Sequence, residues 1–108
     1  MIAIDDFKKI EIKVGLVTGA INQKGSEKLI KLTVNFGSED ERTIFTAVRS
    51  FGYTPEYFLN KKWLFVTNLE PKKIMGEESQ GMILAVDSAD KPIFVPISKK
   101  VDVGAKVR

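Results

Sequence analysis

Hydrophobic and polar side chains alternate strictly from Ile10 to Leu16, which predicts a half-buried strand. Gly15 inside this run indicates a bulge or a close approach of two backbones. A turn at residues 22–26 leads to a second alternating run at 29–36. Residues 37–40 form a turn short enough for a hairpin into a third strand at 42–48. The first half of the chain therefore predicts three sequential strands.

The second half of the chain interrupts these strands with one short helix. Thr54 is suited to an N-cap and Pro55 to the first helical position, which predicts a helix over 55–59. Further strands are expected at 62–69 and 81–86, separated by a long polar loop, and two short β runs follow at 92–97 and 101–107.

The order of three strands, one helix and two strands predicts an all-β fold. It is typical of a five-stranded Greek-key barrel of the oligonucleotide/oligosaccharide-binding (OB) type, with a C-terminal β extension. SH3-like barrels and small sandwiches have similar strand spacing, but the helix between strands three and four favours the OB barrel.

One domain is expected to span 1–108, because no linker or repeat divides the chain. Residues 1–10 form a helical turn in which Asp5 is the expected N-cap and Ile4, Phe7 and Ile10 share a face. The barrel takes 11–87. Residues 88–108 carry more apolar side chains than one small barrel has room for, which predicts a dimerisation extension; the alternative is that they fold back over their own barrel.

The amino-acid composition excludes most of the side chains that enzymes use for catalysis. The 108 residues include no cysteine and no histidine, which excludes disulfides, thiolate nucleophiles, histidine bases and Cys/His zinc sites. No nucleophile–base pair can be assembled from what remains. We therefore expect a binding protein that is not an enzyme and uses no metal and no cofactor.

The net charge of +3 lies entirely in residues 61–108, which hold nine basic and six acidic side chains. This asymmetry hints at a polyanionic partner, although an ordinary solvated surface produces the same count. No signal peptide is visible, and apolar runs such as 82–86 are too short to cross a membrane. A cytoplasmic location with no membrane partner is expected.

The polar segment 68–80 is the first candidate for binding. Lys72 and Lys73 follow Pro71, which stiffens the backbone, and Ser79 and Gly81 offer a hydroxyl and a backbone N–H. A solvated loop whose lysines bind nothing is the alternative. Lys28, Lys31 and Arg42 could form a basic strip that nearby acidic side chains neutralise. Arg49 is either a nucleic-acid contact or a charge at the rim of the barrel. Phe36 and Phe45 are expected in the core.

Residues 68–85 read Asn-Leu-Glu-Pro-Lys-Lys-Ile-Met-Gly-Glu-Glu-Ser-Gln-Gly-Met-Ile-Leu-Ala. This resembles the signature of the tRNA-binding domain family, Asn-Leu-x-Pro-Arg/Lys-Lys/Arg-x-x-Gly-x-x-Ser-x-Gly-Met-x-Leu-Ala. The runs Asp6-Phe7-Lys8-Lys9 and Ile12-Lys13-Val14-Gly15 are similar to the family's opening. One departure is Thr46-Ala47-Val48, where many members have Ser-Gly-Ile.

The resemblance implies an OB barrel that recognises tRNA by shape and largely without regard to sequence. Such a domain is free-standing, often as a homodimer, or appended to a methionyl-tRNA synthetase as a C-terminal domain or β subunit. A secretion-type chaperone that binds unfolded polypeptides is the alternative function, because one branch of the family is chaperone-like. The RNA-binding residues expected from the segment and the resemblance are Lys28, Lys31, Arg49, Asn68, Lys72, Lys73, Met75, Ser79, Gly81 and Met82.

Overall fold

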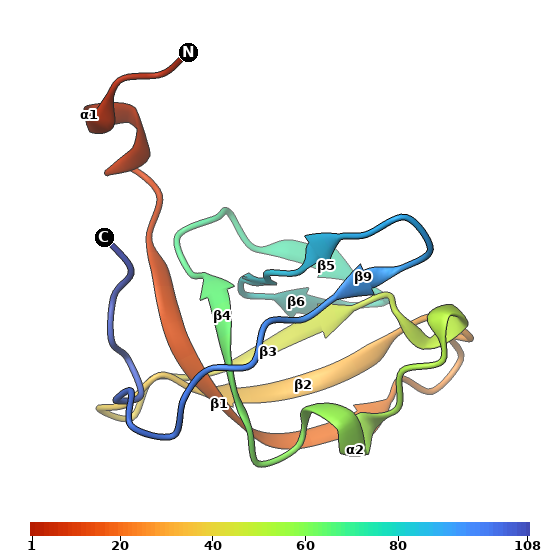
Figure 1. The fold of residues 1–108 in the computed structure, drawn as a ribbon. Coiled ribbons are helices and arrows are strands. Elements are labelled where there is room, and N and C mark those ends of the chain that lie inside the picture. The colour runs from red at the N-terminus through yellow and green to blue at the C-terminus, as the bar shows by residue number, and fades with distance from the viewer.

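Strands make up most of the regular structure in the computed structural model, which describes residues 1–108 (Figure 1). In chain order the elements are α1 (Ile4–Phe7), β1 (Ile12–Asn22), β2 (Ile30–Asn35), β3 (Glu41–Thr46), the 3-10 turn η1 (Arg49–Phe51), α2 (Pro55–Phe58), β4 (Lys62–Val66), β5 (Lys72–Ile74), β6 (Glu77–Ser79), β7 (Met82–Ile83), β8 (Val86–Asp87) and β9 (Pro92–Ile93).

The main sheet is antiparallel, with the strand order β3-β2-β1-β4-β7. β1 serves two neighbours because its first half pairs with β4 and its second half pairs with β2. The register between β1 and β2 shifts between Val17 and Gly19, and such a bulge bends the strand. Gly15 itself is neither at this bulge nor at a close approach of two backbones; side chains crowd it instead, and a Cβ added there would lie 2.5 Å from Val34 Cγ1. The bend and the lack of a side chain at Gly15 let the sheet curl into a barrel.

The barrel closes between β3 and the segment that leads into β7. The backbone N–H of Gln80 donates to the carbonyl oxygen of Thr43 (2.8 Å), and the N–H of Thr43 donates to Gln80 Oε1 (3.0 Å). The N–H of Phe45 donates to Ser79 Oγ (3.1 Å). These bonds satisfy the free edge of β3, so the predicted five-stranded OB-like barrel is confirmed.

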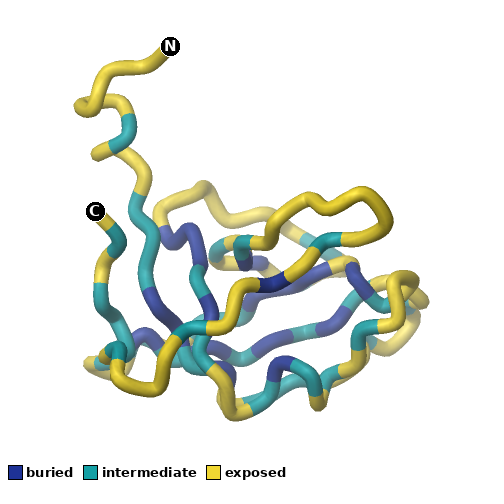
Figure 2. Tube along the Cα trace, in the orientation of Figure 1, coloured by how far each residue is buried: buried dark blue, intermediate teal, exposed yellow.

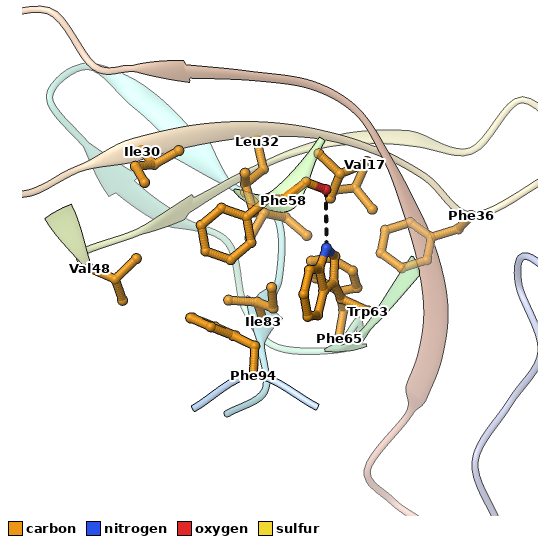
Figure 3. Packing of buried hydrophobic residues seen from close by; sticks show 12 residues of the cluster. Val17, Ile30, Leu32, Phe36, Val48, Phe58, Trp63, Phe65, Ile83 and Phe94 are labelled. Carbon is orange, nitrogen blue, oxygen red and sulfur yellow. Dashed lines mark hydrogen bonds between the residues drawn. The ribbon is translucent and has the colours of Figure 1, made fainter. Parts of the chain in front are cut away.

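The core fills the barrel and is sealed at one end by α2, which Figure 1 places below the sheet. Phe58 of α2 is fully buried, and its carbonyl oxygen accepts a hydrogen bond from Trp63 Nε1 (3.1 Å). Figure 3 shows this bond among the packed side chains. Phe58, Trp63 and Phe94 form edge-to-face pairs, a favourable geometry for aromatic rings. The buried cluster consists of Val17, Ile30, Leu32, Val34, Phe36, Ile44, Val48, Phe58, Trp63, Phe65, Ile83 and Phe94.

Two local expectations at helix starts need correction. Ala3, not Asp5, is the N-cap of α1, and Asp6 Oδ2 accepts a hydrogen bond from the Ala3 N–H (3.2 Å). Asp5 lies inside the first turn, where its charge suits the helix dipole. Thr54 occupies the N-cap position of α2 as expected, but its side chain makes no capping bond.

The polar segment that was expected to be a loop contains the β5–β6 hairpin. Its turn residues, Met75 and Gly76, both have positive φ (49° and 85°), as a two-residue turn between antiparallel strands requires. A methionine in this conformation is uncommon. The strands are only three residues long and rich in charged side chains, so they show no hydrophobic alternation.

Residues 88–108 fold partly back onto the barrel. Phe94 joins the core cluster, and Val14 N–H donates to the carbonyl oxygen of Ala105 (2.9 Å). The expected strand at 101–107 is reduced to an isolated bridge between Lys13 and Lys106. The C-terminus therefore runs beside the start of β1, while α1 projects from the barrel and is almost wholly exposed (Figure 2). None of the helices combines the length and apolar character needed to cross a membrane.

Candidate nucleic-acid interface

The β5–β6 hairpin lies against β3 and the turn that joins β1 to β2. Glu77 carries this contact: its carboxylate lies 2.7 Å from Lys31 Nζ and accepts a hydrogen bond from Gln23 Nε2 (3.4 Å). At the hairpin tip, Met75 Cε lies 3.3 Å from the position that a Cβ on Gly25 would take. These contacts fix the hairpin as one wall of a groove.

The groove has a volume of about 540 Å³ and runs between the hairpin, β3 and the start of β7. Phe45 forms its floor, because this side chain faces away from the core cluster and is not part of it. The walls combine apolar side chains with one cation and one carboxylate. The lining residues are Phe45, Leu69, Glu70, Lys72, Ile74, Ser79, Gly81 and Met82.

Ser79 and Gly81 build the groove more than they face it. Ser79 is 6% exposed, and its hydroxyl accepts from the Phe45 N–H and donates to the carbonyl oxygen of Gly81 (3.3 Å). A Cβ added at Gly81 would lie 2.9 Å from the carbonyl oxygen of Val66, so this position requires glycine for space. Their placement assigns both residues a structural role, and a direct RNA contact by either stays a prediction.

The four predicted lysines do not act as one group. Lys72 lines the groove, whereas Lys73 points to the opposite face of β5, across from Glu78. Lys31 is held beneath the hairpin by its ion pair with Glu77. Lys28 is exposed in the turn before β2 and forms no salt bridge.

Arg49 and Asn68 form hydrogen bonds within the chain, Arg49 through one of its guanidinium nitrogens and Asn68 through both polar atoms of its amide. Arg49 donates through Nη1 to the carbonyl oxygen of Ser26 and so holds the turn between β1 and β2. Asn68 Oδ1 accepts from the N–H of Glu11 (2.8 Å), and its Nδ2 donates to the carbonyl oxygen of Lys9 (2.6 Å). The two predicted methionines are different, because Met75 and Met82 are exposed on the hairpin turn and on β7.

Some features of the interface are not visible in the sequence. Phe45 is buried (7% exposed), as its apolar strand predicts, but only its register with Lys31 shows that it is buried on the groove side of β3. Glu70 lies in the polar segment before Pro71, and no sequence pattern there marks it as a groove residue. Gln80 closes the barrel through both its backbone and its side chain, a role that depends on the distant Thr43.

One carboxylate near the groove has a perturbed pKa. The hydrogen bond from the Thr67 hydroxyl (2.6 Å) lowers the pKa of Glu11, and the charges of Lys13 and Lys106 act in the same direction against partial desolvation. Arg42 Nη1 donates to the carbonyl oxygen of the same Thr67 (2.6 Å). This network ties the start of β1 to the end of β4. No group of three or more histidine, cysteine, aspartate or glutamate side chains is placed to hold a metal ion.

A closed five-stranded barrel with a groove between its third strand, a hairpin and its last strand defines an OB-type binding domain. The profile of the family described as "Putative tRNA binding domain" matches residues 12–106. The chain therefore belongs to the tRNA-binding domain family. It is a binding module and not an enzyme, as the sequence predicts.

Among its relatives is the methionine–tRNA ligase of Methanocella arvoryzae, 42% identical over 99% of this chain and 15% of the ligase. The chain thus spans a small part of the curated relatives it matches. It superimposes with a TM-score of 0.93 on a MetRS related protein from Pyrococcus horikoshii (45% identity, 100% of this chain and 98% of that one). The CsaA chaperone protein from Picrophilus torridus gives 0.87 at 26% identity, with both chains fully covered.

Proposed function

We propose that this protein binds tRNA through its phosphate backbone and overall shape, largely without regard to sequence. The groove beside Lys72 is the observation that carries this proposal, because it places an exposed cation next to an apolar floor in a chain of the tRNA-binding domain family. Lysines contact phosphates as point charges and carry no sequence information.

The planar side chains around the groove are engaged within the protein, which supports binding that reads little of the RNA sequence. Reading a base edge takes two hydrogen-bonding atoms at once, which arginine, asparagine and glutamine supply. Arg42 is occupied by Asp40 and by the carbonyl oxygen of Thr67, Asn68 by the backbone at residues 9 and 11, and Gln80 by Thr43. Arg42 and Asn68 are fully occupied and Gln80 keeps only its amide nitrogen, so charge and shape are the main means of recognition.

The relatives support two settings for this activity. The domain would act as an appended part of a methionyl-tRNA synthetase, as the matches to methionine–tRNA ligases favour, or as a free-standing protein that resembles the MetRS related structure in extent. In either setting it would increase the local concentration of tRNA at the synthetase. A cytoplasmic location follows from this proposal.

A chaperone that binds unfolded polypeptide is the second candidate, favoured by the likeness to the CsaA chaperone protein. The structure also offers an apolar groove of about 210 Å³ lined only by Leu64, Leu84, Ala85, Val86 and Val95. Exposed apolar surface of this kind suits unfolded chains.

A competition experiment separates the two functions. Labelled tRNA bound to the protein is challenged with unlabelled tRNA or with a reduced, permanently unfolded polypeptide. We expect the tRNA to displace the label and the polypeptide to leave it bound. Displacement by the polypeptide at a similar concentration, or binding of the polypeptide alone, would favour the chaperone and contradict the proposal.

We further propose that a second copy of the chain covers the apolar groove, so that the protein is a homodimer. Part of 88–108 folds back on its own barrel, but Val86 and Val95 stay 55% and 47% exposed. The projecting α1 presents Ile4, which is 65% exposed. A two-fold interface would bury these surfaces together with the edge of the β8–β9 pair.

Sedimentation tests the dimer directly. We expect twice the chain mass of 12.1 kDa for the unsubstituted protein and the single mass for Val86→Asp with Val95→Asp. Ile21→Asp, an exposed residue outside the groove, is the control and should leave the dimer intact. A single chain mass for the unsubstituted protein at micromolar concentration would refute the dimer.

A further inference from the structure

A second cationic surface lies around α2, away from the groove. In Figure 1 this surface runs along one side of the barrel, from α2 to the turn before β9. It shares no residue with the lining of the groove. Four residues form this surface, which we call the lysine–tyrosine strip: Lys91, Tyr53, Tyr57 and Lys61.

The strip is ordered by contacts between its charges and its rings. Lys91 Nζ lies 5.1 Å from the centroid of the Tyr53 ring, and Lys61 Nζ lies 5.1 Å from that of Tyr57. The two rings pack with centroids 4.9 Å apart. The hydroxyl of Tyr53 donates to the carbonyl oxygen of Pro92 (2.5 Å), which anchors the strip to β9. Cation–π contacts therefore favour positions of both ammonium groups over the rings before any ligand arrives.

The lysines of the strip have no acidic partner. The salt bridges of the protein involve Lys9, Lys13, Lys31 and Arg42, and none includes Lys61 or Lys91. Glu56 and Asp90 are the acidic neighbours along the chain, and both are exposed without forming an ion pair. Lys31 differs, because Glu77 already neutralises it beneath the β5–β6 hairpin.

Neutral donors accompany these cations. A pocket of about 420 Å³ beside Lys91 is lined by Tyr53, Tyr57 and Thr54, and the hydroxyls of Tyr57 and Thr54 have no hydrogen-bond partner within the protein. Beyond Lys61, a smaller pocket of about 250 Å³ is lined by Lys61 and Lys99, and by Lys62, whose ammonium already donates to the carbonyl oxygens of Lys99 and Val101. No carboxylate lines the pocket beside Lys91, and lysine, tyrosine and threonine are donors that contact phosphates in nucleic-acid complexes.

We infer that the lysine–tyrosine strip is a second phosphate-contacting surface, which binds the RNA backbone at a point separate from the groove. This inference rests on the proposed tRNA binding and extends it. Two separate surfaces on one barrel contact separate parts of a folded RNA, so recognition depends on the RNA's shape as well as its charge.

The test compares salt dependence in matched variants. Lys61→Ala with Lys91→Ala removes the two ordered ammonium groups. Lys8→Ala with Lys106→Ala removes the same charge from exposed lysines near the termini. The affinity for one folded tRNA is measured between 50 and 200 mM salt. The strip variant should have a slope of log affinity against log salt that is shallower by about 1.4–1.8 than that of the unsubstituted protein. Over this salt range, the fall in affinity of the variant should therefore be smaller by a factor of about ten. The control slope should match that of the unsubstituted protein.

Each outcome decides one question. If the unsubstituted protein binds tRNA and the strip variant keeps the control's slope and affinity, the strip does not contact RNA and the inference is overturned, while the proposed function stands. If the unsubstituted protein does not bind tRNA, the proposed function fails and the strip fails with it. Equal thermal midpoints of the two variants show that any difference arises from contact and not from unfolding.

Discussion

Replacing Ser79 with alanine should open the barrel at the point where β3 meets the segment leading into β7. The serine hydroxyl accepts from the N–H of Phe45 (3.1 Å) and donates to the carbonyl oxygen of Gly81 (3.3 Å), and the side chain is 6% exposed. Alanine leaves a buried backbone N–H without a partner, which costs about 1–3 kcal/mol. For a domain of this size that loss lowers the thermal midpoint by roughly 5–20 °C.

Urea and thermal unfolding measure this cost, with Ser50→Ala as the matched control. Ser50 is exposed in η1, and its side chain forms no hydrogen bond, so its loss should change stability by less than about 0.5 kcal/mol. At temperatures where both variants are folded, we expect similar affinity for tRNA. A Ser79→Ala protein as stable as Ser50→Ala but with weaker tRNA binding would refute the structural role and restore the serine as an RNA contact.

Three further changes test the surrounding fold. Gly15→Ala should lower the unfolding free energy by about 1–3 kcal/mol in urea, because its Cβ would lie 2.5 Å from Val34 Cγ1, whereas Gly19→Ala meets only ordinary contacts and should be neutral or stabilising. The lowered pKa of Glu11 means that its stabilisation is complete above about pH 4.5 and is lost as the pH falls through the folded-state pKa; Glu11→Gln should flatten this part of the pH–stability curve. Asn68→Ala should release the start of β1, seen as faster amide exchange at residue 11 with little change elsewhere.

The barrel was predictable because its long strands carry a clear hydrophobic period. Ile30, Leu32 and Val34 are fully buried and alternate with half-buried polar residues, as the sequence indicates. Pro55 likewise marked the start of α2 within a residue. Where one face of a strand packs against a core, the alternation reports the fold directly.

The parts that sequence did not reveal depend on contacts between distant segments. The β5–β6 hairpin has charged residues on both faces and is held by the Lys31–Glu77 ion pair, so it shows no hydrophobic pattern. Phe45 is apolar, as core residues are, and it forms the floor of the groove.

The signature itself carries two kinds of information that sequence cannot separate. Lys72 and Met82 face the groove, whereas Asn68 and Ser79 serve hydrogen bonds within the chain. A motif shared by a family records both binding and folding requirements, and only the geometry distinguishes them.

The central claim is that phosphate contacts beside the groove bind tRNA without reading its sequence. The most direct measurement is the affinity for several unrelated tRNAs over a range of salt concentrations, for the unsubstituted protein and for Lys72→Ala. We predict affinities within about tenfold of one another, a linear fall of log affinity with log salt, and a slope shallower by about one in the variant. An affinity that does not change with salt, or a preference of about a thousandfold for one tRNA, would contradict the account.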